Sequence, residues 1–448
     1  MRHLPSGWAP STLGHVCDSG QYGWTTSATG HGQVRFLRTT DITKRTIDWT
    51  SVPFCIDVPK DLSRYLLAAN DIVVSRAGSV GFSKLLSDVP SPTVFASYLI
   101  RFKTTFAVDP RYVAAYLRSP MYWRDIGKAA AGIALANINA TKLAALPMPL
   151  PPLREQQRIA DKLDTVLDRV DACRERLARV APLLKRFRQS VLAAATSGQL
   201  TEDWRGNAAY TWAQMRAEDA CAKVQSGGTP KAGFTETSGV PFLKVYNIVN
   251  QRIDFEYRPQ FVHPAVHAGE LGKSRALPGD VLMNIVGPPL GKVAVLTDAS
   301  PEWNINQAIT LFRPSARITT GWLYLLLCEG AAVRSVLGRT KGSVGQVNIS
   351  LSQCRAFEFP VPPIDEQNEI VRRVETLFAF SDRLEARLAQ AQTAVDRLTP
   401  SLLAKAFRGE LVPQDPADEP AAELLKRLAA SRSSPAAKTR KRRQGQAD

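Results

Sequence analysis

The chain has 448 residues, of which 44% are hydrophobic, and its 57 Lys and Arg against 41 Asp and Glu give a formal net charge of +16. This length predicts roughly three or four structural units, and the longest strongly apolar run, Trp322–Cys328, is far too short to span a membrane. The surplus of positive charge favours a polyanionic partner, most simply nucleic acid.

The first 148 residues are predicted to form a domain of mixed α and β structure. Apolar and β-branched runs predict strands at Val34–Leu37, Asp71–Ser75 and Tyr98–Phe102, and a helix is expected near Pro110–Leu117. The proline-rich segment 147–152 is interpreted as a stiff connector, because proline neither continues a helix nor donates a backbone hydrogen bond.

Residues 149–200 predict one long helix that ends at Gly198. Apolar residues recur at alternating spacings of four and three, the pattern of a coiled-coil seam, and Cys173 occupies one seam position as a small hydrophobe. Pro182 falls on the side that faces away from the seam. The principal seam residues of this helix are Ile159, Leu163, Val166, Val170, Leu177 and Leu184.

The second half of the chain repeats the first. Pro149–Gln156 returns as Pro360–Gln367, and the match runs without a gap, at an offset of 211, to the Gly-x-Leu endings at Gly198 and Gly409; 18 of 52 positions are identical. Residues 201–358 therefore predict a second mixed domain, and residues 359–412 a second helix, with Pro400 facing outward. Its seam residues are Ile370, Val374, Leu377, Leu384, Leu388 and Leu402.

Further elements are expected in this second half. Strands are predicted at Phe242–Tyr246, Val281–Ile285, Val293–Leu296 and Ala308–Phe312, a helical stretch at Gly321–Leu337, and a stiff connector at 360–363. Residues 413–448 are interpreted as a mobile basic tail.

The two helices are expected to pair with each other. Antiparallel pairing within one chain relates the two repeats by a pseudo-twofold axis. About 32 residues of seam span ~48 Å, which corresponds to about 14 base pairs of B-DNA. The alternative is an intermolecular coiled coil in a scaffold protein.

Catalytic and cofactor motifs are absent from the sequence. Gly287–Lys292 resembles a phosphate loop but is one residue short and lacks the Ser or Thr after the lysine. The acids of Asp365–Asn368 are better explained as helix capping. The sequence contains no His-Glu-x-x-His, no Gly-x-Ser-x-Gly, no cysteine pair suited to zinc, and no Asn- or Asp-Pro-Pro-aromatic signature of amino-methyltransferases. With no signal region and no sign of disulfides, we expect a non-catalytic recognition protein in the cytoplasm.

The duplicated Pro-x-Pro-Pro-Leu/Ile-x-Glu-Gln opening, the heptad helix and the Gly-x-Leu close resemble the conserved regions of Type I restriction-modification specificity subunits. Ser226–Lys231 and Phe242–Asn247 are similar to segments that open target recognition domains in that family. The resemblance covers residues 1 to about 412. The first block departs from the pattern, because Ser226–Lys231 has no clear counterpart near Ser19–Thr29.

The resemblance implies an α+β fold, in which two mixed α/β target recognition domains are separated by two long antiparallel coiled-coil helices with pseudo-twofold symmetry. It implies that each domain reads one half of a bipartite double-stranded DNA target, and that two modification (methyltransferase) subunits and the restriction (translocase/nuclease) subunits join the chain. S-adenosylmethionine, ATP and Mg would bind those partners and not this chain. Two rivals stay open: a coiled-coil adaptor without sequence-specific DNA binding, and a self-contained restriction-methylation enzyme, which the missing methyltransferase signature argues against.

Candidate DNA contacts follow from the chemistry of readout. Arg or Lys reads guanine, Asn or Gln reads adenine, and Lys or backbone groups contact phosphates. In the first domain the candidates are Arg38, Thr40, Asp41, Arg76 and Lys84; in the second they are Thr229, Lys231, Lys244, Tyr246, Asn247, Lys341 and Gln346.

Overall fold

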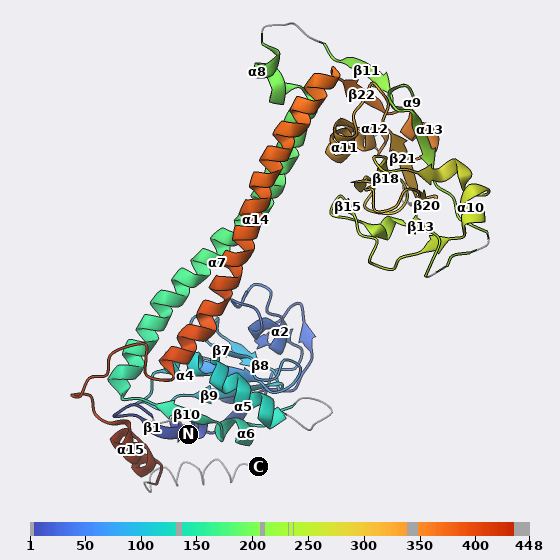
Figure 1. Cartoon of the computed structure of the whole chain (residues 1–448). Helices are drawn as coiled ribbons and strands as arrows, with labels where there is room; N and C mark the ends of the chain where they lie inside the picture. The colour runs from blue at the N-terminus through green and yellow to red at the C-terminus, as the bar shows by residue number, and fades with distance from the viewer. Residues whose placement is uncertain are drawn as a thin grey trace. The chain divides into compact units, whose positions relative to one another are not determined.

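The computed structural model describes residues 4–130, 137–206, 211–231, 233–235, 237–337 and 348–433. The chain divides into two compact units, Met1–Leu177 with Gln390–Asp448 and Ala178–Ala389 (Figure 1). The boundary between the units falls inside both long helices, α7 (Leu153–Thr196) and α14 (Ile364–Ala406). These helices lie within the ranges 149–200 and 359–412 predicted from the sequence.

The β structure of the first unit consists mainly of two four-stranded sheets among the described residues. One has the order β2-β9-β6-β7 and is antiparallel; the other has the order β3-β5-β4-β8, in which β4 and β8 are parallel. All three predicted strands are present as β4, β6 and β9. The bounds are β2 (Gln21–Tyr22), β3 (Ala28–Thr29), β4 (Arg35–Leu37), β5 (Phe54–Cys55), β6 (Asp71–Ser75), β7 (Ser83–Leu85), β8 (Thr93–Phe95) and β9 (Leu99–Lys103).

Short helices cover these sheets. The predicted helix near Pro110–Leu117 is α4 (Pro110–Tyr116), which begins at a proline after the capping residue Asp109. Its Tyr112 and Tyr116 are fully buried and pack against Phe407, just beyond α14. The others are α1 (Leu13–Val16), α2 (Thr39–Ile42), α3 (Leu62–Tyr65), α5 (Pro120–Ala130) and α6 (Ala140–Ala144).

The segment after α14 packs on the first unit. Helix α15 (Ala421–Ser433) buries Leu424 and Leu428 in the same core as Tyr112, and Asp418 forms a 2.7 Å ion pair with Arg158 of α7. The prediction of a mobile tail from residue 413 onward is therefore wrong for residues 413–433, because the amphipathic patch of this segment completes the core. The basic run Lys438–Arg443 lies outside the described residues.

The second unit repeats one sheet of the first unit strand for strand and three strands of the other; the fourth strand differs, because β17 pairs with β20 whereas β3 pairs with β5. Its sheets have the orders β12-β21-β18-β19 and β16-β13-β20-β17, and β13 and β20 are parallel as β4 and β8 are. This correspondence confirms the duplication. The bounds are β12 (Lys223–Ser226), β13 (Val240–Leu243), β14 (Ile248–Val249), β15 (Arg252–Ile253), β16 (Phe261–Val262), β17 (Arg275–Ala276), β18 (Val281–Asn284), β19 (Val293–Val295), β20 (Trp303–Ile305) and β21 (Ile309–Arg313).

Two predicted elements of the second unit are interrupted. The strand expected at Phe242–Tyr246 ends at Leu243 and gives way to a 3-10 turn, η2 (Val245–Asn247). The helix expected at Gly321–Leu337 divides at Gly330, whose φ of 83° ends α11 (Thr320–Glu329) before α12 (Ala331–Leu337). The remaining short helices are η1 (Gln199–Thr201), α8 (Glu202–Arg205), α9 (Ala217–Ala220), α10 (Pro264–Ala268), η3 (Gly272–Ser274) and α13 (Leu351–Arg355).

Within each unit, α7 and α14 pair antiparallel. In the second unit Arg188 forms a 3.2 Å ion pair with Glu385, and the carbonyl oxygen of Leu200, just beyond α7, accepts from Arg373 Nη1 at 2.8 Å, so advancing from α7 means going back along α14. In the first unit Arg174 forms a 3.2 Å ion pair with Asp396, whereas the earlier Ile159 and Leu163 share a core with the later Leu403 and Ala406. Of the predicted seam residues, Ile159, Leu163, Val170, Leu184, Ile370, Val374 and Leu388 are buried, and Val166, Leu177, Leu377, Leu384 and Leu402 are partly buried.

Other details of the seam differ from the prediction. Cys173 is exposed, so it does not act as a seam hydrophobe. Ile159 and Ile370 belong to the cores of the two units as well as to the paired helices. Pro182 and Pro400 are exposed inside continuous helices, as their outward-facing positions predicted.

The two proline-rich segments are strands and not simple connectors. β10 (Pro147–Leu150) pairs antiparallel with β1 (Ala9–Thr12), and β22 (Glu358–Val361) pairs with β11 (Ala213–Arg216). Alternate residues of a strand point their N–H groups to the same edge, so Pro147 and Pro149 leave the N–H groups of Met148 and Leu150 free for pairing. The spacing of the prolines therefore permits the two-stranded sheet that precedes each long helix.

Candidate nucleic-acid interface

The start of each long helix carries an identical glutamate–tryptophan contact. Trp8 Nε1 donates to Glu155 Oε2 at 3.0 Å, and Trp212 Nε1 donates to Glu366 Oε2 at 3.0 Å. Oε1 of Glu366 also accepts from Arg205 Nη1 at 2.5 Å. The two tryptophans lie next to β1 and β11, so this contact joins the first strand of each domain to the helix.

The adjacent glutamine completes the join. Gln156 Oε1 accepts from the backbone N–H of Asp109 at 3.1 Å, and Gln367 Oε1 accepts from that of Thr319 at 2.8 Å. Asp109 and Thr319 are the residues that cap α4 and α11. Of the acids expected to cap the second long helix, Glu366 instead binds Trp212 and Arg205. The buried pair therefore fixes each β-rich domain to the helix that follows it.

The second unit places two of its candidates in a tight turn. Asn247 is buried, its Oδ1 accepts from Lys244 N at 3.0 Å, and its Nδ2 donates to the carbonyl oxygens of Asp254 and Tyr257 at 2.9 and 3.0 Å. Lys244 Nζ lies 4.2 Å from the centre of the Phe234 ring. An amide with three internal partners must break them to read a base, so Asn247 has a clear structural role, and its DNA contact stays a prediction.

The other described candidates of the second unit are more accessible. Tyr246 donates to the carbonyl oxygen of Arg258 at 3.1 Å and is half-buried, which raises the pKa of its hydroxyl. Thr229 and Lys231 are exposed in the loop after β12, where the Lys231 backbone N–H binds Glu270 at 2.9 Å. Lys341 and Gln346 lie outside the described residues.

The first unit repeats the turn with other residues. Asp41 is buried and accepts from Arg38 N at 2.9 Å and from the Arg38 guanidinium at 3.2 Å. Arg38 and Asp41 thus occupy the positions that Lys244 and Asn247 have in the second unit, and their side chains bind each other. Thr40, between them, is exposed. The repeat between these two segments thus marks a shared turn as well as candidate DNA contacts.

Lys84 lies in a groove beside α7. Its Nζ donates to the carbonyl oxygen of Arg45, and burial, followed by the nearby Arg118 and Arg45, lowers the pKa of Lys84. Arg45 in turn pairs with Asp171 of α7 at 2.9 Å. These contacts make Lys84 part of the junction between the domain and the helix.

Arg76 differs from the other arginines among the candidates. Its guanidinium stacks 5.0 Å from the centre of the Tyr22 ring, and its Nε is buried without a hydrogen-bond partner in the described part of the chain. Tyr22 was missed by the sequence analysis, since a lone aromatic residue before a glycine gives no periodic signal. Among the predicted contacts of the first unit, Arg76 has a guanidinium held over an aromatic ring, and its donors bind no acceptor in the described ranges.

The structure also supplies the counterpart that the sequence comparison lacked. Gly23 and Gly227 occupy equivalent sites, where an added Cβ would lie 2.2 Å from the carbonyl oxygen of Phe95 and 2.0 Å from that of Ile305. The motif Ser226–Lys231 has no clear counterpart in sequence near Ser19–Thr29, but its glycine has an equivalent backbone position there. The side chains around these two glycines differ between the units, but in both units another backbone segment comes so close that only glycine fits.

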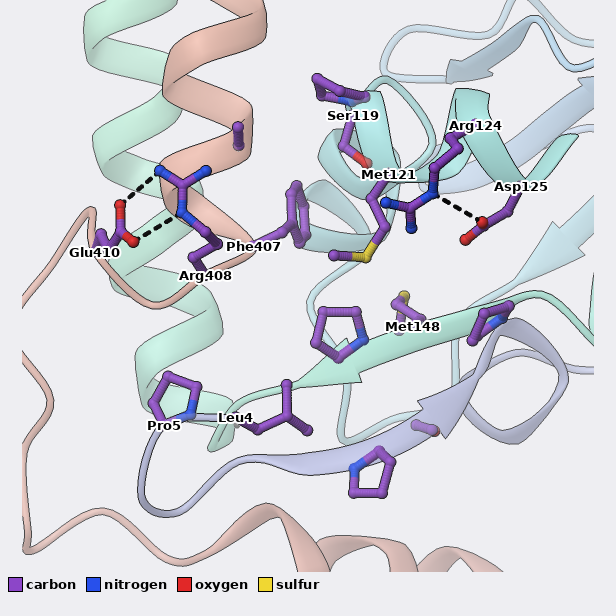
Figure 2. Close-up of a pocket in the computed structure, with 16 residues that line it drawn as sticks. Leu4, Pro5, Ser119, Met121, Arg124, Asp125, Met148, Phe407, Arg408 and Glu410 are labelled. Atoms are coloured by element: carbon purple, nitrogen blue, oxygen red, sulfur yellow. Dashed lines mark hydrogen bonds and ion pairs between the residues drawn. The ribbon is translucent and has the colours of Figure 1, made fainter. Parts of the chain in front are cut away.

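An open pocket of about 950 Å³ in the first unit has a different character (Figure 2). Its apolar lining includes Met121, Met148 and Phe407. Its two arginines each pair with a neighbouring carboxylate, Arg124 Nε with Asp125 at 3.2 Å and Arg408 with Glu410 at 2.7 Å (Figure 2). Since both cations are neutralised, this pocket is a poor site for phosphates.

Metal and nucleotide sites are not found among the described residues. They contain no group of three or more His, Cys, Asp and Glu side chains that could hold a metal ion, and no helix long and apolar enough to cross a membrane. Gly287–Lys292 is the turn between β18 and β19, held by the Asn284 amide through the carbonyl oxygens of Gly287 and Pro289 at 3.2 and 3.0 Å. It leads into a strand, whereas a phosphate loop leads into a helix.

Comparisons with known proteins agree with the duplicated fold. A sequence profile of the Type I restriction modification DNA specificity domain matches residues 5–181 and 210–392, once in each repeat. The chain is 29% identical over 428 residues to the type I restriction enzyme EcoKI specificity subunit of Escherichia coli (strain K12), covering 91% of this chain and 90% of that protein. It is 30% identical over 452 residues to the StySPI specificity subunit of Salmonella potsdam, covering 96% of each.

Two solved structures have the same fold. The HsdS subunit from Thermoanaerobacter tengcongensis superposes with a TM-score of 0.60 at 19% identity, over 91% of this chain and 98% of that one. A chain solved in work on complex assembly and conformational transition of the type I R-M system gives a TM-score of 0.72 at 19% identity, over 92% of this chain and 100% of that one. With the profile matching both repeats and most of the sequence aligned to relatives, the chain belongs to the Type I restriction modification DNA specificity domain family.

Proposed function

We propose that this chain is the DNA-recognition subunit of a Type I restriction-modification complex. Each β-rich domain reads one half of a bipartite target, and the paired helices set the length of the unread spacer. The observation that carries the proposal is the duplication itself. One scaffold occurs twice, fixed to its helix by the same Glu-Gln pair, while the candidate reading residues differ between the copies.

The chemistry of the complex is assigned to partner subunits. Two modification subunits would methylate adenine with S-adenosylmethionine, and restriction subunits would translocate and cleave DNA with ATP and Mg, all in the cytoplasm. The chain contributes recognition and geometry. Its formal charge of +16 supports binding to a polyanion, because cationic side chains release counterions from the phosphate backbone.

Sequencing of methylated bases in the host, with and without this gene, tests the proposal. We expect a two-part motif separated by a fixed number of unspecified bases, present only when the gene is present. A coiled-coil adaptor predicts no change in the methylation pattern. Absence of any two-part motif from a host that makes the chain and its modification partner would overturn the proposal.

A further inference from the structure

Arg76 is held by its backbone at the end of β6. Its N–H donates to the carbonyl oxygen of Tyr98 at 2.9 Å, and its own carbonyl accepts from Ile138 N at 2.9 Å. Both neighbours bind the main chain, so the position of the Cα atom is fixed from two sides. The side chain therefore starts from a fixed backbone position.

The guanidinium is also oriented. It lies 5.0 Å from the centre of the Tyr22 ring, and the Tyr22 hydroxyl accepts from Ala140 N at 3.0 Å. Tyr22 is thus held at its backbone by β2 and at its hydroxyl by the start of α6, while 40% of it stays exposed. This cation–π contact with a fixed ring holds the guanidinium carbon over Tyr22, beside the end of β6.

The charge of Arg76 is not compensated. Within the described residues its guanidinium takes part in no ion pair and no hydrogen bond, and its Nε is buried without a partner. By contrast, Arg38 and Arg101 of the same domain bind Asp41 and Asp71. The buried Nε is out of reach of an external partner, but the two terminal nitrogens are absent from the buried atoms and bind no described acceptor, so they are the donors that an external acceptor would use.

The scaffold does not need an arginine here. Ile285 occupies the same place in the second unit, with its N–H bound to Ala308 O at 2.8 Å and its carbonyl bound by Ile349 N at 2.9 Å. Ser226, at the end of β12, stands where the first unit has Tyr22. The Arg76–Tyr22 pair is thus an addition to a backbone shared by both domains, and such differences are what two readers of unlike half-sites require.

We propose that Arg76, oriented by Tyr22, reads a guanine in the half-site that the first unit recognises, an inference that rests on the function proposed above. The two terminal nitrogens of a planar guanidinium match the O6 and N7 acceptors of guanine in the major groove. A phosphate contact uses the same charge but carries no base preference. The substitutions Arg76→Ile and Arg76→Lys distinguish a guanine contact from a phosphate contact.

The experiment maps methylated motifs in a methylation-free host that makes the modification partner and one variant of the chain. Arg76→Ile introduces the residue found at the equivalent position of the second unit, and Arg76→Lys keeps the positive charge but loses the two parallel N–H donors of the guanidinium. For both variants we expect preference for one G·C pair in one half-site to fall by about 5- to 150-fold. The other half-site and the spacer should not change. Lys60→Ala, which removes one exposed positive charge from the same unit, should leave the motif intact.

The outcomes are distinct. If the wild-type chain gives no two-part motif, the proposed function fails. If the wild type gives a motif and Arg76→Ile gives the same motif with the same efficiency, only the guanine assignment fails. If Arg76→Ile lowers methylation equally at all sequences while Arg76→Lys restores it, Arg76 contacts a phosphate and the assignment is overturned. Melting temperatures of the variants establish that any change in motif occurs in folded protein.

Discussion

The glutamates of the duplicated Glu-Gln pair should respond differently to the same substitution. Glu155 and Glu366 each accept a 3.0 Å hydrogen bond from a tryptophan indole. Their other carboxylate oxygens differ: that of Glu366 accepts from Arg205 Nη1 at 2.5 Å, whereas that of Glu155 is buried and takes part in no ion pair in the described part of the chain. Replacing each glutamate by glutamine therefore removes an ion pair in the second unit alone.

The magnitude follows from these contacts. In Glu366→Gln the new NH₂ group must face either the Trp212 indole or the Arg205 guanidinium, and both are donors. We estimate a loss of about 3 kcal/mol, the lower end for a broken buried pair because the Arg205 side chain keeps 19% exposure. That loss lowers the melting temperature of a unit of this size by about 6–12 °C.

In Glu155→Gln the amide oxygen keeps the Trp8 contact. The unpaired amide nitrogen offsets the gain from removing a buried charge, so we expect a change below about 1 kcal/mol at neutral pH.

The Glu155 substitution should also remove a dependence on pH. Burial raises the pKa of Glu155 above its usual value of 4.5. The folded protein therefore binds this proton more tightly than the unfolded chain. The contribution of Glu155 to stability is fully present below pH 4.5 and is lost as the pH rises through the raised pKa. The stability of Glu155→Gln relative to the wild type should consequently increase as the pH is raised from 4.5.

Differential scanning calorimetry of the full chain between pH 5 and 8 measures both effects. Glu375→Gln, at an exposed position of α14, is the matched control and should melt as the wild type does. Equal losses in Glu155→Gln and Glu366→Gln would show that the Arg205 ion pair does not stabilise the second unit. A stability difference between Glu155→Gln and the wild type that does not vary with pH would show that Glu155 does not titrate differently on folding.

Two substitutions test the packing of the paired helices and of the domain. Ser381→Ala should raise the melting temperature by about 2–4 °C, because the Ser381 hydroxyl is buried with no partner among the described residues. Ser401→Ala, at an exposed position of the same helix, is the control and should have no effect. A lower melting temperature for Ser381→Ala would contradict the prediction. Gly23→Ala should cost about 3 kcal/mol, because its Cβ would lie 2.2 Å from a backbone oxygen, while Gly30→Ala enters open space. Equal urea unfolding midpoints for the two glycine variants would show that the backbone yields.

The repeat, the two long helices and many of the strands could be predicted because each rests on a local period. The spacing of Ile159, Leu163 and Leu184 identifies an apolar stripe without knowledge of the partner. Packing of α15 could not be predicted in this way, since the core around its short patch at Leu424 is made largely by elements more than 250 residues earlier, such as Tyr112.

The candidate site was predictable by residue type but not by role. Asp41 and Asn247 repeat because each closes a turn through its own backbone contacts, and repetition alone cannot separate that role from DNA contact. Arg76 and Tyr22 meet only when β2 and β6 are placed on either side of β9 in one sheet. Matching the backbone hydrogen bonds and strand registers of the two units shows that Arg76 and Tyr22 are replaced by Ile285 and Ser226 in the second unit, and this difference identifies the pair.

The spacer of the methylated motif is the most direct measurement of the central claim, that two reading domains are held apart by paired helices. A suitable variant lacks residues 181–187 of α7 and 383–389 of α14, the heptads next to the Arg188–Asp382 ion pair, so that the seam keeps its register. Seven residues span about 10.5 Å, or about 3 base pairs. The account predicts an altered spacer, shorter by about that length, between two unchanged half-sites. An active variant with unchanged spacing would contradict it.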